Sequence, residues 1–155
     1  MFRVVLTAMD ANANVKPYKE VLNEGNAFDT RENAEIYMLR AMTEEVSELN
    51  QPDAYNTPHT RVFIADLDGD HDAIVRLWDG DDYWDVSYYD IKETIILNEV
   101  PKVGDFVTID ENLIMAGYLL EIIGDEAIVE IDNHTGHRID SFKLSDLCVA
   151  SNPLE

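Results

Sequence analysis

The sequence has a single cysteine, Cys148, among its 155 residues. An internal disulfide and a metal site built from several thiolates are therefore excluded. Cys148 lies in the apolar segment DLCVA, so we expect a small buried hydrophobic residue rather than a catalytic thiol. No apolar run approaches the ~20 residues that cross a bilayer, and the N-terminus becomes polar too early for a secretory signal. These absences predict a cytoplasmic protein with no membrane partner.

Basic residues are also scarce, with 11 Lys and Arg against 32 Asp and Glu, for a net charge of −21. The excess is concentrated after residue 50: residues 51–100 carry twelve acids and three bases, and residues 101–155 carry eleven and three. The electric field of so negative a chain repels nucleic acid and anionic lipid and speeds encounter with basic partners. High solubility alone is the simpler interpretation. Hydrophobic residues make up 46% of the chain, which is enough for a buried core.

Signatures of common enzymes are missing as well. The sequence contains no GxSxG, no phosphate-binding glycine loop, no dinucleotide fingerprint and no HExxH. Paired carboxylates are so abundant that no particular pair indicates acid–base catalysis. We therefore predict that the protein is not an enzyme and needs no cofactor.

The clearest structural signal lies between Arg61 and Asp90. Three short runs rich in Val, Ile, Phe, Tyr and Trp are separated by two acidic turns, each with a glycine. This pattern predicts an antiparallel meander. The predicted strands are Val62–Ala65, Ala73–Trp78 and Tyr83–Tyr89.

A helix is predicted before this meander, from about Thr30 to Leu49. Asp29 fits an N-cap, and Glu32 three residues later completes a capping box. Residues 2–9 predict a first strand, and residues 15–28 include a short second strand. The expected fold class is α+β, with the helix packed on an antiparallel sheet in residues 1–100.

The last third of the chain shows about five short strand patterns separated by Gly-Asp and Asn-rich turns. They are 106–109, 115–123, 126–131, 137–144 and 148–150. Residues 101–153 form the second expected subdomain, after a boundary at Pro101. Leu154 and Glu155 are interpreted as the remnant of a tag.

This last third resembles the SH3-like barrels of the KOW type. The matching residues are Val103-Gly104-Asp105-x-Val107, Gly117-Tyr118, Glu121 to Asp125, Ala127-x-Val129-Glu130 and Phe142-x-Leu144-x-x-Leu147. The resemblance implies a small β-barrel, and members of this family often bind RNA, ribosomes or peptides. This segment lacks the basic loops of the nucleic-acid-binding members, so we expect no direct contact with nucleic acid.

Three segments are candidates for metal sites, because closely spaced carboxylates suit a hard cation and histidines suit zinc. The segment from Asp66 to Asp72 fails the EF-hand pattern, since position six is His71 rather than Gly and position twelve is Leu77 rather than Glu. His134 and His137, with Asp132 nearby, lack the spacing of a zinc signature. The third segment is Asp79-Gly80-Asp81-Asp82. We interpret all three segments as turns and assign no metal ligand.

The main functional hypothesis is a non-enzymatic acidic interaction protein that binds a basic protein surface. Its strongest form is a nucleic-acid mimic of phage or mobile-element type, whose carboxylates stand in for phosphates. One alternative is a small-ligand or peptide-binding module that uses the aromatic strand and the barrel, and another is a divalent-metal-binding protein. The partner and the oligomeric state are left open. The predicted binding residues are Asp66, Asp68, Asp70, Asp72, Asp79, Asp81, Asp82, Asp85, Tyr83 and Trp84.

Overall fold

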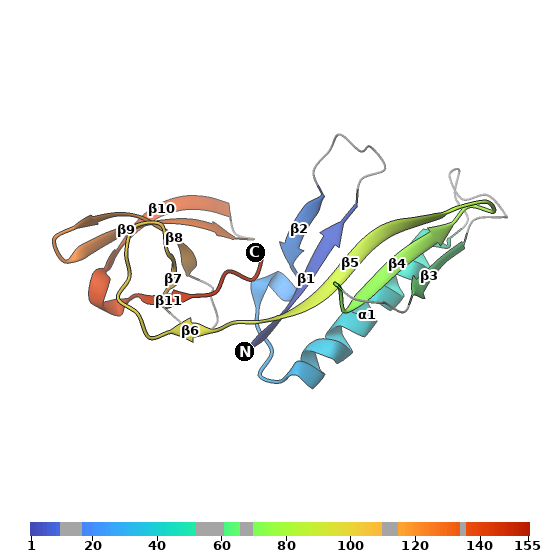
Figure 1. The fold of residues 1–155 in the computed structure, drawn as a ribbon, viewed down its shortest axis with the longest axis horizontal. Helices are drawn as coiled ribbons and strands as arrows, with labels where there is room; N and C mark the ends of the chain where they lie inside the picture. The colour runs from blue at the N-terminus through green and yellow to red at the C-terminus, as the bar shows by residue number, and fades with distance from the viewer. Residues whose placement is uncertain (10–16, 52–60, 66–69, 110–114, 134–135) are drawn as a thin grey trace. The chain divides into compact units, whose positions relative to one another are not determined.

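The computed structural model describes residues 1–9, 17–51, 61–65, 70–109, 115–133 and 136–155 (Figure 1). Strands make up 51% of the structure and helical residues 20%, and the strands form two antiparallel sheets. The predicted α+β fold, a helix on a sheet followed by a small barrel, is therefore wrong: the protein is mostly β. The helix is a minor component because strands recur along almost the whole chain.

The first sheet has five strands in the order β2-β1-β5-β4-β3. The predicted meander is confirmed, because β4 pairs antiparallel with both β3 and β5. The expected first strand and the short second strand are also present. The bounds are β1 Phe2–Ala8, β2 Tyr18–Val21, β3 Arg61–Ala65, β4 Ala73–Trp78 and β5 Tyr83–Glu93.

Helix α1 spans Arg31–Leu49. A cap at Asp29 would have started the helix at Thr30, one residue earlier. Thr30 is the N-cap, since its hydroxyl accepts the N–H of Asn33 at 3.1 Å. The prediction that Asp29 caps the helix is therefore wrong. Like a carboxylate, the hydroxyl oxygen accepts a hydrogen bond from a backbone N–H that has no partner within the helix.

One stripe of α1 is buried and contains Ala34, Met38 and Met42. The carboxylate of Glu45 lies at the edge of this stripe and accepts the hydroxyls of Ser87 and Tyr89, each at 2.5 Å. Burial, followed by this bond to Glu45, raises the pKa of Tyr89 far above the usual range of a tyrosine. Tyr89 is therefore a neutral hydrogen-bond donor in the folded protein.

The second sheet has six strands in the order β10-β9-β8-β7-β11-β6. All five strand patterns predicted for the last third are present, and β6 precedes them. The bounds are β6 Ile96–Leu97, β7 Phe106–Thr108, β8 Ala116–Ile123, β9 Glu126–Asn133, β10 Gly136–Lys143 and β11 Cys148–Ala150. Short 3-10 helices lie at Asn23–Gly25 and Leu144–Asp146. The resemblance to SH3-like barrels stays a prediction.

A compact apolar cluster forms on one face of this second sheet. Alternate residues of β9 point into it, as a period of two requires. Its buried members are Val107, Leu119, Ala127, Val129, Ile131, Leu147 and Val149. Cys148 lies next to the buried Val149 but is exposed, so the prediction that it is buried is wrong. Ala150 shares this face of β11 and is buried, so the exposure is confined to Cys148 at the start of the strand.

The chain divides into two compact units. The helix-bearing unit comprises Val4–Glu20 and Thr30–Ile91. The C-terminal unit comprises Met1–Arg3, Val21–Asp29 and Lys92–Glu155. The domain boundary predicted at Pro101 and the tag interpretation of the last two residues stay predictions. No helix among the described residues is long and apolar enough to cross a membrane.

Gly117 in β8 provides a test of the packing of the second sheet. A Cβ atom at this position would lie 2.0 Å from the carbonyl oxygen of Glu130 in β9. Because this obstacle is backbone, Gly117→Ala should lower the free energy of unfolding by about 3 kcal/mol, measured by urea denaturation. Gly124→Asn is the control: its φ of +62° suits asparagine, and nothing lies within 4 Å of its Cβ position. Equal losses in the two variants would contradict the close approach of β8 and β9.

Candidate functional site

The hairpin tip between β4 and β5, residues 79–82, concentrates acidic side chains. The Oδ1 atom of Asp79 accepts the backbone N–H groups of Asp81 at 2.9 Å and of Asp82 at 2.8 Å. The backbone of Gly80 has a φ of +105°, which glycine adopts readily. An Asp-Gly pair with the carboxylate folded over the following amides is a common way to build such a turn. Asp79 thus fixes the tip on which Asp81 and Asp82 are exposed.

The second carboxylate oxygen of Asp79 binds an aromatic side chain. The indole Nε1 of Trp84 donates to Oδ2 of Asp79 at 3.1 Å. The backbone N–H groups of Asp82 and Asp81, and then the Trp84 indole, lower the pKa of Asp79 below its ordinary value. The carboxylate is therefore fully ionised at neutral pH and holds Trp84 beside the acidic tip.

Tyr83 and Trp84 open strand β5 as large exposed aromatic residues, 64% and 58% exposed respectively. The Tyr83 ring forms a T-shaped pair with Phe63 in β3, with centroids 6.1 Å apart and planes at 82°. Aromatic residues are enriched in protein recognition sites, whose rims are polar. The tip residues 79–84, which we call the hairpin site, combine both.

A β-bulge separates the hairpin site from the rest of β5. Val75 pairs with Ser87, but the next residue, Arg76, pairs with Asp85, so Val86 is the extra residue. Because opposed residues share a face, Asp85 points to the face opposite that of Ser87.

On that face, Asp85 accepts Nε of Arg76 at 2.8 Å and the hydroxyl of Tyr88 at 2.7 Å. Partial burial raises the pKa of Asp85, but the bonds from Tyr88 and Arg76 outweigh it, so its pKa is lowered overall. The hydrogen bond to Asp85 raises the pKa of Tyr88. The imidazole ring of His71 stacks on the Tyr88 ring, with centroids 4.2 Å apart. Asp85 is thus held by neighbouring side chains.

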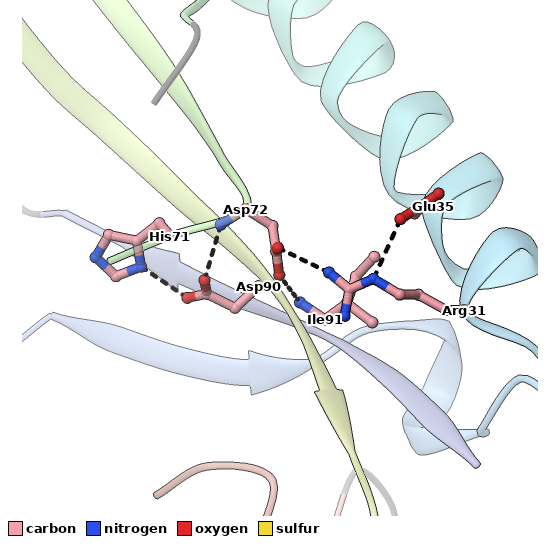
Figure 2. A network of polar contacts seen from close by, with 6 residues as sticks. All are labelled: Arg31, Glu35, His71, Asp72, Asp90 and Ile91. Carbon is pink, nitrogen blue, oxygen red and sulfur yellow. Dashed lines mark hydrogen bonds and ion pairs between the residues drawn. The ribbon is translucent and has the colours of Figure 1, made fainter. Parts of the chain in front are cut away.

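At the far end of β4, Asp72 links three elements (Figure 2). Its Oδ1 atom accepts Nη2 of Arg31 at 2.9 Å, and its Oδ2 atom accepts the backbone N–H of Ile91 at 2.7 Å. Arg31 also donates to Glu35 one turn further along α1, at 3.2 Å. Asp72 therefore joins the first turn of the helix to strand β5.

Asp90, on the neighbouring strand β5, binds Asp72 and His71 in turn (Figure 2). Its Oδ1 atom accepts the backbone N–H of Asp72 at 3.1 Å, and its Oδ2 atom lies 2.7 Å from Nδ1 of His71. The side chain of Asp90 is only 12% exposed, so these donors replace the water that a carboxylate would otherwise bind. The pair is reciprocal: each aspartate accepts a backbone N–H of the opposite strand.

The structure places the ten predicted binding residues in different surroundings. Asp79, Asp81, Asp82, Tyr83 and Trp84 come together in the hairpin site. Asp72 and Asp85 are engaged in hydrogen bonds within the fold, and Asp70 is exposed near the start of β4. Asp66 and Asp68 lie outside the described residues.

The histidine and metal interpretations can be compared with part of the chain. His137 lies 2.7 Å from the carboxylate of Glu130 on β9, whereas His134 and the side chain of Asp132 lie outside the described residues. Within the parts of the chain that are described, no three His, Cys, Asp or Glu side chains gather as metal ligands would.

Sequence reasoning missed residues that join the strands and helix of this unit, and it misread the role of Asp79. His71 had no evident partner in the sequence, and Asp90 is 19 residues away from it. Asp79 was counted as a binding residue, although the Asp-Gly pair was itself a signal for a structural turn. Glu45 gave no local signal, because its partners Ser87 and Tyr89 are distant in the chain.

Comparison with known proteins found no matching family model, no similar curated protein and no similar solved structure.

The bond between Asp79 and Trp84 predicts a local loss of order in one variant. Asp79→Ala should release the indole, so the fluorescence anisotropy of Trp84 should fall in a Trp78→Phe background. Asp81→Ala removes the same charge from the same turn but leaves the acceptor in place, so its anisotropy should stay unchanged. A similar fall in both variants would contradict the role of Asp79.

The lowered pKa of Asp85 predicts that the protein loses stability as the pH becomes acidic. Its pKa in the folded protein is lowered, so its stabilising effect is complete above the ordinary aspartate value of 3.8 and is lost as pH falls through the folded value. Asp85→Asn should lower the free energy of unfolding by about 1 kcal/mol at pH 7. The difference from wild type should shrink below pH 3.8. A difference that grows on acidification would contradict this assignment; Asp81→Asn serves as the exposed control.

Proposed function

We propose that this protein is a non-enzymatic acidic interaction protein that binds a basic protein surface through the hairpin site. The observation that carries the proposal is the geometry of Asp79, which holds Trp84 while presenting Asp81 and Asp82 on an ordered turn. A site that is already ordered loses less conformational entropy on binding.

The chemistry of the hairpin site fits Lys and Arg side chains. Exposed carboxylates accept charged hydrogen bonds from guanidinium and ammonium groups. The faces of Tyr83 and Trp84 also attract cations, with an energy of roughly 0.5–1 kcal/mol at an exposed position. The net charge of −21 adds a long-range attraction that increases the rate of encounter with a basic partner.

The strongest form of the proposal is mimicry of nucleic acid. Asp81 and Asp82 stand at the tip, and Asp70 is exposed near the opposite end of β4, so exposed negative charge is present at both ends of this strand. Protein grooves that bind nucleic acid are lined with Lys and Arg that pair with phosphates. The proposed partner is thus a nucleic-acid-binding protein. The acidic chain would occupy its binding groove in place of the nucleic acid.

Paired charge reversals provide the test. The partner is captured from a lysate of the source organism at low salt, purified, and titrated with the wild type and each variant. Asp81→Lys with Asp82→Lys should weaken binding at least tenfold, and raising the salt should weaken the wild type strongly. Glu44→Lys with Glu48→Lys makes the same change in net charge on the exposed side of α1 and should weaken binding much less.

Other outcomes separate the alternatives. If the charge reversal at the tip leaves binding intact while Trp84→Ala abolishes it, the protein is a ligand or peptide module that uses its aromatic strand. If both double variants weaken binding equally, net charge alone is responsible and the hairpin site is not the interface. Association that does not respond to salt would contradict the acidic interaction itself.

A further inference from the structure

Strand β10 lies at one edge of the second sheet, in a hairpin with β9 (Figure 1). Among the described residues it pairs only with β9, along its whole length from Gly136 to Lys143. Its residues are exposed from Gly136 through Ser141, and Ile139 at the middle is 61% exposed. An edge strand presents backbone N–H and C=O groups to any further strand that can lie beside it.

The charges of β10 are arranged symmetrically about Ile139. Arg138 and Asp140 flank it on the opposite face of the strand, with side chains 48% and 47% exposed and their charged atoms 3.6 Å apart. Consider an antiparallel copy of the same strand related by a two-fold axis at Ile139. Arg138 then faces Asp140 of the second copy, Asp140 faces Arg138, and Ile139 faces itself. Opposite charges and apolar residues that face each other directly stabilise antiparallel pairs.

We propose that the chain forms a symmetric dimer in which β10 pairs with β10 of a second copy about this axis. The ladder would run from Gly136 to Phe142 and would extend the second sheet continuously through both copies. The interface is isologous, so each contact occurs twice. This inference concerns a different unit from the hairpin site and does not depend on the proposed function.

The other sheet edges do not have this self-complementary pattern. An axis on Lys19 or Glu20 of β2 would place like charges opposite each other. An axis on Phe63 of β3 creates no pair of opposite charges, and β6 has only two residues. β10 is also a favourable place for two acidic chains to meet, because the strand itself carries two bases and one acid.

The first test measures mass against concentration by analytical ultracentrifugation. The wild type should show a concentration-dependent dimer. Arg138→Asp and Asp140→Arg each place two like-charge pairs across the axis, so each alone should weaken the dimer about tenfold or more. Lys102→Asp is the control, because it makes the same charge change as Arg138→Asp at an exposed position outside β10.

Mixing the two single variants tests the pairing itself. In a mixed dimer, the two aspartates that flank Ile139 in the Arg138→Asp chain face the two arginines that flank it in the Asp140→Arg chain. The mixture should therefore associate more tightly than either variant alone. The double variant with both changes should dimerise like the wild type. Circular dichroism checks that every variant is folded, so lost association cannot be attributed to unfolding.

A disulfide tests the register of the ladder. Facing residues in an antiparallel pair have Cα atoms about 4.5–5.5 Å apart, within the range for a disulfide. In a Cys148→Ser background, Ile139→Cys should therefore crosslink two copies under mild oxidation. Ser141→Cys lies on the same face, but its copies would be about 13 Å apart along the strands and should not crosslink.

Several results would overturn the proposal. They are a chain that is monomeric at every concentration, a dimer unaffected by Arg138→Asp, a mixture of the single variants that does not associate, and equal crosslinking through positions 139 and 141. A monomer that instead binds an extended peptide along β10 would show that the edge serves a different partner, and would also reject the symmetric dimer.

Discussion

The helix-bearing unit depends on a reciprocal contact between Asp72 and Asp90. Each carboxylate accepts a backbone N–H from the neighbouring strand, and each also binds a side chain, Arg31 in one case and His71 in the other. A chain with 32 acidic residues must supply donors for every carboxylate that it turns inward. Here backbone N–H groups and hydroxyls supply part of them, so basic residues are not needed in equal number.

The acidic residues therefore fall into two groups, those bonded within the fold and those exposed on its surface. Asp72, Asp85, Asp90 and Glu45 accept hydrogen bonds within the helix-bearing unit and join its strands and helix. Other acids, such as those at the tip of the hairpin, remain exposed and create the negative field outside. Asp79 belongs to both groups, because it is exposed and yet orders the turn. The hairpin site is thus ordered by Asp79, while the carboxylates of the first group are engaged within the fold.

Much of the strand arrangement was predictable from sequence, because alternation of apolar residues and Asp-Gly turns are local signals. The meander and the strands of the last third were found in this way. The fold class was wrong, because a single strong helix signal was given more weight than many short strands. Cys148 was misplaced because an apolar sequence context does not show which side chain at the start of a strand is covered. The contacts of His71 and Glu45 join residues far apart in sequence, so no local pattern could have indicated them.

The extra residue in β5 lets one strand serve both faces of its sheet. Asp85 and Ser87 are two positions apart and would share a face in a regular strand, yet Val86 turns them to opposite sides. Deleting that single residue would make Asp85 and Ser87 neighbours in a regular strand, so they would still point to opposite faces and Asp85 would stay opposite Arg76. A strand one residue shorter at this point would therefore keep the contacts of both Asp85 and Ser87, and the extra residue adds local bend and twist to the sheet.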